Sequence, residues 1–378
     1  MSVKNCRVCG NRFFQGALLQ YKNMPKVAQF LPEKGKLKSD KGVNLRVYQC
    51  SGCGLVQLDS GPVPYYKEVI RAVGFSREMM NFRQKQFASL IDKFSLKGKK
   101  VIEIGCGCGE YLSIMQECGV QAYGLEYSRL SVARCIKNGL KASRGFIRGS
   151  TEKLKYAPFD AFYILSFLEH LPDPNSVLRG IFNNLRDGAV GLVEVPNFDM
   201  ILRNKIFSEF MTDHLFYFTK ETLATALRLN GFRVIECNQV WRDYIISAVV
   251  KKGERLDLAD FYKYQVKLKN EVEGYLRRFK NKKVAIWGAG HQALAVIALL
   301  NLSGKIQYVI DSAPFKQGKF TPATHIPIVA PDILKLEPPD AVIIMAAGYS
   351  NEVARIIRKK FDGSIDIAIF RDYGLEII

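Results

Sequence analysis

The spacing of apolar residues indicates a regular alternation of helices and strands through the middle of the chain. From about Ser76, one face of an amphipathic helix is marked by Met80, Phe87, Leu90, Ile91 and Phe94. Six apolar runs follow, separated mostly by helical patterns: KKVIEIG, QAYGLEY, DAFYILSF, VGLVEVP, FRVIECNQV and DYIISAVVKK. This alternation predicts a parallel sheet with helices on both faces. The last two runs lie so close together that we expect them to form an antiparallel pair at one edge.

A second strand, glycine turn and helix begin after a connector rich in Lys, Glu and Leu, Leu256 to Phe279. The pattern reads KKVAIWGAGHQALAVIALL, followed by IQYVID, and predicts a second Rossmann-like unit that runs to residue 378. A chain of 378 residues is too long for one ordinary domain. We therefore expect an α/β protein with domains at 1–75, 76–252 and 253–378.

Composition and charge narrow the function only slightly. Hydrophobic residues make up 48% and charged residues 24%, as in globular proteins. The N-terminus has no signal-peptide pattern, and no segment has the roughly 20 apolar residues that span a bilayer. We therefore expect a cytoplasmic protein without a membrane partner, as a monomer or small homo-oligomer. The net charge of +19 suits nucleic acid or another anionic ligand. No basic block accompanies it, so a nucleic-acid partner is not favoured.

The first segment contains two CxxC pairs, CRVC and CSGC, with thiols at Cys6, Cys9, Cys50 and Cys53. Two such turns allow four thiolates to reach one ion, which predicts a tetrahedral zinc site. Four cysteine ligands leave no position open for water or substrate, so we expect the zinc to be structural. The other cysteines are scattered singly, which favours a reducing compartment over a disulfide framework.

A glycine-rich turn follows the first strand of the middle segment, in VIEIGCGCGEYLSIM. Gly105, Gly107 and Gly109 would let a ligand approach the backbone, next to the unpaired N–H groups of a helix N-terminus. Glu126 ends the next strand, where it can accept hydrogen bonds from ribose hydroxyls. These residues predict a nucleoside-containing ligand. The same pattern also fits NAD, because an acid about 20 residues beyond the turn belongs to the dinucleotide fingerprint.

The downstream sequence separates these two ligands. GSTEKL and FDAFYILSFLEHLPDPNSVLRGIFNNLRDG resemble the later motifs of class I S-adenosylmethionine-dependent methyltransferases. The resemblance implies S-adenosylmethionine as the cofactor. It adds Ser150 and Thr151 beside the adenine, Ser166 beside the methionine portion, and Glu103 from the first motif. Ser150 stands where the family usually has aspartate.

The resemblance extends along the chain to the nucleotide-sugar C-methyltransferases. It rests on the CxxC pairs, on EVPNF and DHLFYFT in the core, and on GAGH and DSAPFKQGKFTPATHIPI in the tail. Members of that family methylate a carbon beside the ketone of a nucleoside-diphosphate 4-keto-6-deoxy sugar, commonly C3. The resemblance thus implies a sugar-nucleotide substrate and a role in deoxysugar or polysaccharide biosynthesis.

The family also implies the catalytic residues. His214 falls on the position of the family's base, Asp213 on a neighbouring carboxylate, and His170, in LEHLPD, on a second histidine. The chemistry needs such groups, because a C–H bond is not a nucleophile. A base must remove the proton beside the ketone, and a donor must stabilise the enolate oxygen. An imidazole with an ordinary pKa of about 6.5 suits this task near neutral pH.

Three departures from the family lie at positions where the resemblance would place contacts to the sugar substrate. Two family tyrosines align with Met211 and Ile70, and a glycine- and serine-rich turn becomes VWRDYIIS, Val240 to Ser247. Either another residue, such as Tyr217, Tyr244 or Arg242, stabilises the enolate, or the substrate and the reaction differ.

In the tail, Gly288, Gly290, Ala293 and Asp311 form a loose dinucleotide fingerprint. The family implies a Rossmann relic that helps to enclose the sugar nucleotide, which we favour over a second cofactor site. Four residues could contact the diphosphate or sugar, although a solvated basic loop explains them equally well: His291, Lys316, Lys319 and His325.

Three other functions compete with this interpretation. A sugar O-methyltransferase would use the same base on a hydroxyl. An RNA methyltransferase would explain the zinc head and the charge, but SFLEHLPDP lacks the Asn/Asp-Pro-Pro-aromatic motif of base amino-methylating enzymes. A nonenzymatic binding protein, held together by zinc and with a vestigial cofactor site, is disfavoured because the glycines of the turn and Glu126 are all present.

Overall fold

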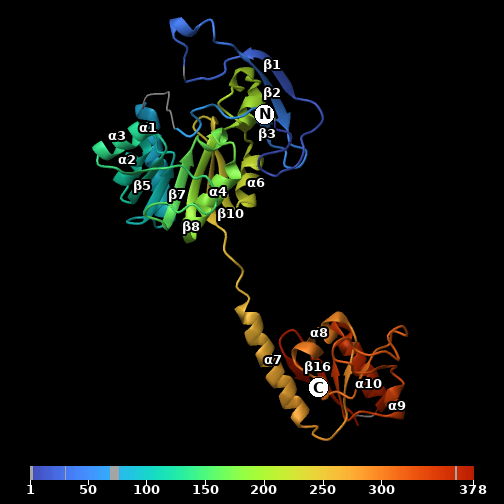
Figure 1. Cartoon of the computed structure of the whole chain (residues 1–378). Coiled ribbons are helices and arrows are strands. Elements are labelled where there is room, and N and C mark those ends of the chain that lie inside the picture. The colour runs from blue at the N-terminus through green and yellow to red at the C-terminus, as the bar shows by residue number, and fades with distance from the viewer. Residues whose placement is uncertain (1–2, 30, 69–75, 362–363) are drawn as a thin grey trace. The chain divides into compact units, whose positions relative to one another are not determined.

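The computed structural model describes residues 3–29, 31–68, 76–361 and 364–378, and it divides the chain into two compact units (Figure 1). The first unit is Met1–Glu254 and the second is Arg255–Ile378. The cysteine-bearing N-terminal segment, predicted as domain 1–75 and called the head below, belongs to the first unit. None of the helices in the described part is both long and apolar enough to cross a membrane.

A seven-stranded sheet forms the centre of the first unit, in the order β10-β11-β8-β7-β4-β5-β6. Its strands are β4 (Lys100–Ile104), β5 (Gln121–Glu126), β6 (Lys141–Arg144), β7 (Phe159–Leu165), β8 (Leu185–Pro196), β10 (Phe232–Val240) and β11 (Ile245–Lys252). The five strands from β8 to β6 pair in parallel, and β11 is antiparallel to both of its neighbours. The predicted parallel sheet with an antiparallel edge pair is therefore confirmed.

Helices cover both faces of this sheet, whereas the apolar residues of α5 pack against the four-stranded sheet described below. The helices of the first unit are α1 (Arg77–Lys93), α2 (Glu110–Glu117), α3 (Arg129–Lys137), α4 (Pro174–Asn183), α5 (Phe198–Asn204) and α6 (Lys220–Leu229). Side chains of α1 and α2 pack into one core with β4, and side chains of α4 and α6 pack into another on the opposite face. Single turns of 3-10 helix lie at Lys34–Lys36, Leu168–His170 and Phe207–Glu209.

Helix α1 differs from its prediction at one position. Ser76 caps it, accepting a hydrogen bond from the Met79 N–H, and Phe87 lies in the core as expected. Met80, predicted on the buried face, is 41% exposed, whereas Arg83 is only 2% exposed. A cation thus occupies an inward position of the amphipathic helix.

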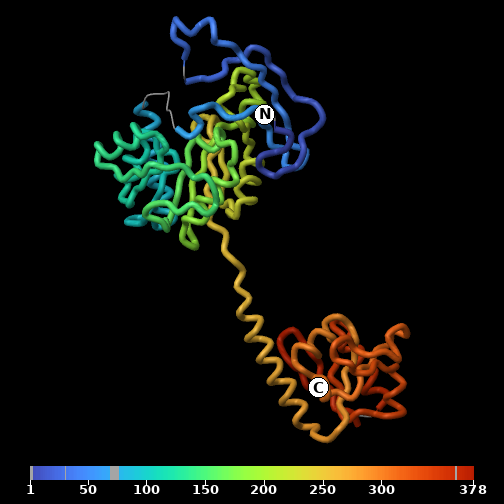
Figure 2. The backbone as a smooth tube through the Cα atoms, in the orientation of Figure 1, coloured from blue at the N-terminus to red at the C-terminus, as the bar shows by residue number. Residues whose placement is uncertain are grey.

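A four-stranded sheet, β1-β2-β3-β9, joins the cysteine-bearing segment to the core. Its strands are β1 (Leu19–Met24), β2 (Val43–Gln49), β3 (Val56–Leu58) and β9 (Phe216–Tyr217). The last strand comes from the DHLFYFT segment and pairs antiparallel with β3. Figure 2 shows the N-terminal segment, in blue, beside this later, yellow-green part of the chain.

The second unit is a smaller α/β structure with the sheet order β14-β13-β12-β15-β16-β17. Its strands are β12 (Val284–Trp287), β13 (Tyr308–Ile310), β14 (Ile328–Val329), β15 (Ala341–Ile344), β16 (Asp366–Phe370) and β17 (Leu375–Ile377). Its helices are α7 (Ala259–Arg277), α8 (His291–Leu299), α9 (Ile333–Leu336) and α10 (Ser350–Phe361), with a 3-10 turn at Ala347–Tyr349. Strands β14 to β16 pair in parallel, in agreement with the Rossmann-like prediction.

Candidate active site

The glycine turn after β4 holds the carboxylate of Glu126 in a fixed orientation. The Gly107 N–H donates to Glu126 Oε2 at 3.0 Å, and the Ser128 N–H donates to Oε1 at 2.9 Å. Glu126 is 1% exposed and ends β5. Two backbone donors therefore fix an acceptor at the carboxyl end of the parallel strands, where ligands of such sheets bind.

Two further residues of this motif support the turn. Gly109 has φ +92° and caps α2, and a Cβ there would lie 2.5 Å from Leu140 Cδ1. A side chain is therefore excluded by backbone conformation and by space. Glu103 is fully buried and accepts a hydrogen bond from the Tyr163 hydroxyl at 3.0 Å. It lies beneath the turn.

A small pocket opens beside this turn. Eleven residues line it, namely Lys67, Ile104, Gly105, Leu125, Glu126, Tyr127, Gly145, Phe146, Ile147, Phe167 and Val177. Its aromatic and aliphatic side chains, beside a fixed carboxylate, are of the kinds that contact the base and ribose of a nucleoside. Ser150 and Thr151, predicted beside the adenine, are exposed and do not line this pocket. The residues directly after β6, Gly145 to Ile147, line it.

A second cavity of about 690 Å³ shares Phe167 with the small pocket, so the two are neighbours. This size is typical of a site for a small organic ligand. Its wall combines residues of the head and of the core: Gln29, Tyr65, Tyr66, Arg83, Tyr111, Ser166, Glu169, His170, Asp213, His214, Trp241 and Tyr244 are among them. The predicted catalytic residues and Ser166 thus lie on the same cavity.

His170 and His214 face each other in this wall. Their rings are 4.8 Å apart between centroids and are inclined by 72°. His170 Nδ1 lies 2.8 Å from the Asp213 backbone oxygen. A carbonyl only accepts, so Nδ1 carries the proton and Nε2 keeps a free lone pair. Sequence analysis placed both histidines in the site, and the structure brings them together.

Glu169 is a buried carboxyl that sequence analysis did not single out. It is 1% exposed, and neither of its carboxyl oxygens has a hydrogen-bond partner in the described part of the chain. Its Oε1 lies 4.0 Å from His170 Nε2. Its position directly before His170 in LEHLPD could have identified it as a site residue. Its burial could not be predicted, because it depends on the tertiary structure.

Burial keeps these three groups uncharged near neutral pH. Desolvation by burial raises the pKa of Glu169 to about 8 and outweighs the lowering effect of its own backbone N–H. Burial, and to a smaller extent the charge of His170, lowers the pKa of His214 to about 3. Burial also lowers the pKa of His170. Two unprotonated imidazoles and a neutral carboxyl therefore line the cavity together.

Asp213 connects the loop that carries His214, called the histidine loop below, to the head. Its carboxylate accepts hydrogen bonds from the Tyr65 hydroxyl at 2.8 Å and from the Ala28 N–H at 3.2 Å. The Tyr65 oxygen in turn accepts from the Ala28 N–H at 2.9 Å. The carboxylate is thus directed to the head, and the Asp213 backbone oxygen holds His170.

The three candidate enolate stabilisers have different environments. Tyr217 is 3% exposed, and its hydroxyl is held by the Met211 backbone at 3.0 and 3.3 Å. Arg242 is on the surface in an ion pair with Glu78 at 2.8 Å. Tyr244 lines the cavity. Of the two family-tyrosine positions, Met211 lines the cavity and Ile70 lies outside the described residues.

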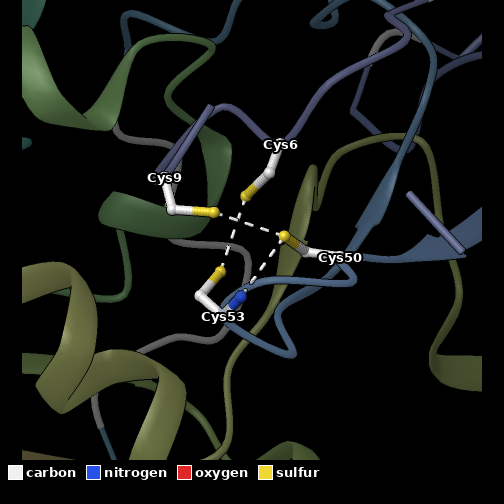
Figure 3. A group of neighbouring side chains, drawn as sticks. All are labelled: Cys6, Cys9, Cys50 and Cys53. Carbon is white, nitrogen blue, oxygen red and sulfur yellow. Dashed lines mark hydrogen bonds between the residues drawn. The ribbon is translucent and has the colours of Figure 1, made fainter. Parts of the chain in front are cut away.

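The four cysteines of the CxxC pairs converge on one point (Figure 3). Cys6 Sγ lies 3.7 Å from Cys53 Sγ, and Cys9 Sγ lies 3.3 Å from Cys50 Sγ. Zn–S bonds of about 2.3 Å in a tetrahedron separate the sulfurs by roughly 3.8 Å. The Gly52 and Cys53 N–H groups also point at Cys50 Sγ. This donor set fits a tetrahedral zinc ion.

The second unit contains the residues of the loose dinucleotide fingerprint and the predicted diphosphate or sugar contacts. Asp311 accepts hydrogen bonds from the Ala289 N–H, the Ala313 N–H and Lys316 Nζ at 2.8 to 2.9 Å. Its oxygens are therefore occupied within the protein. His291, Lys319 and His325 are exposed.

Comparison with known proteins agrees with the glycine turn and its pocket. Residues 79–237 match the family described as "Methyltransferase domain", and residues 250–365 match "C-methyltransferase C-terminal domain". The chain is an S-adenosylmethionine-dependent methyltransferase. Its first unit has the class I methyltransferase fold, and the carboxylate and pocket at the glycine turn fit that cofactor.

The methyltransferase is 22% identical to "C-methyltransferase NovU" of Streptomyces niveus, over 93% of this chain and 91% of that one. It is 38% identical to a "Ubiquinone biosynthesis O-methyltransferase" of Stutzerimonas stutzeri (strain A1501), over 26% of this chain and 44% of that one. A solved S-adenosylmethionine-dependent methyltransferase from Clostridium acetobutylicum ATCC 824 aligns with a TM-score of 0.39 and 13% identity, covering 50% of this chain and 96% of that one. The strand order β10-β11-β8-β7-β4-β5-β6 of the first unit gives the fold.

Proposed function

We propose that the methyltransferase adds a methyl group to C3 of a nucleoside-diphosphate 4-keto-6-deoxy sugar, through an enolate. The observation that carries this proposal is the pair His170 and His214 on the cavity beside the cofactor pocket. C-methylation requires a base within reach of the carbon that loses its proton. The relative named C-methyltransferase, which matches most of the chain, supports the same reaction class.

The residues of this chain have separable roles in the proposed reaction. S-adenosylmethionine, held by Glu126 and the glycine turn, supplies an electrophilic methyl group. His214 removes the proton from C3, so that the electron pair of the C–H bond becomes the enolate. His170 lies against His214 and keeps its Nε2 lone pair toward the cavity. The bonds of Asp213 to Tyr65 and Ala28 hold the loop in place.

Glu169 has a role that depends on its remaining protonated. Since its pKa is about 8, it adds no negative charge beside the developing enolate at pH 7. Above pH 8 it ionises, 4.0 Å from His170 Nε2, and the enolate becomes harder to form. We therefore expect kcat to fall above pH 8. The Glu169→Gln variant, which stays neutral, should lack this fall, and an identical alkaline limb in both proteins would contradict the role.

Proton exchange tests the base separately from methyl transfer. In heavy water, with S-adenosylhomocysteine in place of the methyl donor, the wild type should exchange the proton beside the ketone. His214→Asn should bind both ligands and react about 10² to 10⁴ times more slowly, the usual contribution of a general base.

Product NMR decides between carbon and oxygen methylation. A methyl group bonded to C3 is the expected result. A methyl group bonded to oxygen would identify a sugar O-methyltransferase, and would contradict the proposal even if His214 were essential. Normal turnover by His214→Asn would remove His214 from the mechanism.

We also propose that Cys6, Cys9, Cys50 and Cys53 bind one structural zinc ion. The convergence of their four sulfurs supports this assignment. Freshly purified protein should contain one zinc per chain by elemental analysis, and Cys50→Ser should lose it together with the folded head. Metal-free protein that folds normally would contradict a structural role.

A further inference from the structure

Arg83 is a buried cation on α1, in the wall of the large cavity. It is 2% exposed, and its guanidinium lies 5.0 Å from the ring centroid of Tyr111. Its Nη1 donates to Glu194 Oε2, and also to Gln86 Oε1 at 2.7 Å. Glu194 is fully buried in β8, so the pair brings no net charge into the core.

One edge of this guanidinium remains unused within the part of the chain that the structure describes. Both recorded hydrogen bonds use Nη1, and the buried Nε has no partner. A buried N–H without a partner costs free energy, so such groups are rare and need an explanation. Nε and Nη2 together form the side of arginine that grips a carboxylate with two parallel hydrogen bonds.

The position of Arg83 indicates which carboxylate this edge would meet. The nucleoside pocket and the large cavity meet at Phe167, so a ligand held by Glu126 continues into the large cavity. On that side the wall contains Tyr111, in the helix that starts directly after the glycine turn, and Ser166, at the end of β7. Arg83 lies against Tyr111 there.

We infer that the free edge of Arg83 binds the α-carboxylate of the methionine portion of the cofactor. The ligand class is an α-amino acid joined through sulfur to adenosine. The inference uses cofactor binding only and does not depend on the sugar substrate. A phosphate of the acceptor is the competing anion, and the experiment below separates the two.

The test compares two ligands that differ in the amino-acid portion. S-adenosylhomocysteine carries the carboxylate, whereas 5′-methylthioadenosine has the same nucleoside and sulfur without it. Wild-type protein should bind S-adenosylhomocysteine more tightly by calorimetry. Arg83→Met should weaken S-adenosylhomocysteine binding about 10- to 100-fold, as expected for lost hydrogen bonds to a charged group, and should leave 5′-methylthioadenosine binding unchanged. Arg83→Lys, which keeps the charge but not the fork, should fall between them.

Two controls address the buried ion pair. Glu194→Gln removes the partner but keeps the free edge, so it should retain the preference for S-adenosylhomocysteine. Arg83→Met combined with Glu194→Gln removes both charges and should lose that preference while still binding 5′-methylthioadenosine.

Three outcomes would overturn the inference. Unchanged S-adenosylhomocysteine affinity in Arg83→Met would show that the carboxylate lies elsewhere. An equal loss of both ligands in every Arg83 variant would assign Arg83 to the fold. Weaker sugar-nucleotide binding with normal S-adenosylhomocysteine binding would assign the edge to the acceptor's phosphate.

Discussion

The two compact units contain similar strand–glycine turn–helix patterns, but their acidic residues have different surroundings. Glu126 is held by two backbone N–H groups and lines a pocket. Asp311 is occupied by two backbone N–H groups and by Lys316. Gly288 also packs against its own sheet, since a Cβ would lie 2.5 Å from the Met345 oxygen.

The difference extends beyond the turns. The wall of the large cavity contains two groups without a hydrogen-bond partner among the described residues, the carboxyl of Glu169 and the Nε of Arg83. Polar groups that a fold leaves unsatisfied are expected where a ligand completes them, and their cost is offset by the rest of the structure. The same sequence pattern therefore indicates a binding site only when the hydrogen bonds around it remain available.

The largest expected effect is on the pH dependence of stability. In the native protein the pKa of Glu169 is raised to about 8 from an ordinary 4.5. Between these values the unfolded chain releases a proton that the native state keeps, so the free energy of unfolding falls as pH rises. Glu169→Gln lacks this loss. Its advantage over wild type should grow from near zero below pH 4.5 to as much as about 5 kcal/mol above pH 8.

Urea unfolding at pH 4.5, 6.5 and 8.5 measures this difference. Parallel stability curves for the two proteins would mean that Glu169 is not held protonated, and would contradict its proposed role in catalysis.

The next effect compares the two acids directly. Glu126→Ala should weaken S-adenosylhomocysteine binding by about 10- to 100-fold, because two hydrogen-bonded ribose contacts are lost. Asp311→Ala should leave that affinity unchanged, since the cofactor site predicted here lies in the first unit. Calorimetry on both variants provides the measurement, and loss of affinity in Asp311→Ala would reverse the comparison.

A smaller effect compares the glycines. Gly109→Ala forces a side chain into φ +92° and against Leu140, so we expect a loss of about 1–3 kcal/mol and weaker cofactor binding. Gly290→Ala is the matched control, because nothing lies within 4 Å of its Cβ and its φ is −82°. Thermal unfolding should leave this variant within about 0.5 kcal/mol of wild type.

The smallest effect concerns Arg242, a candidate for enolate stabilisation. Its ion pair with Glu78 is exposed, with 77% and 63% of the two side chains accessible. Arg242→Ala should therefore change stability by less than about 1 kcal/mol and leave kcat unchanged. A large drop in kcat would show that Arg242 reaches the substrate during the reaction.

The parts of the fold that depend on local pattern could be predicted from the sequence. Periodicity located the strands and the edge pair, and the glycine spacing located the turn that holds Glu126. Prediction was weakest where contacts join distant segments. Arg83 meets Glu194 across a sequence separation of 111 residues, and no local pattern reports that pairing. The burial of Glu169 likewise depends on tertiary contacts with segments that are distant in the sequence.

The residues predicted to contact the adenine show a different limit of prediction from sequence. Ser150 and Thr151 were placed by alignment to a motif, whereas Gly145 to Ile147 line the pocket. Strand β6 ends at Arg144, and residues that follow a parallel strand directly are the ones that face the ligand. The strand end and the motif thus point to different residues for the adenine, and the role of Ser150 and Thr151 stays a prediction.

The pairing of β9 with β3 has a consequence for the order of assembly on the ribosome. The head is synthesised first, but the fourth strand of its sheet is Phe216–Tyr217, which follows most of the methyltransferase core. The head therefore cannot complete its sheet as an independent N-terminal domain, although such domains usually fold first during synthesis. A nascent chain stalled before Phe216 should be cleaved by protease within the head, and one stalled after residue 254 should resist.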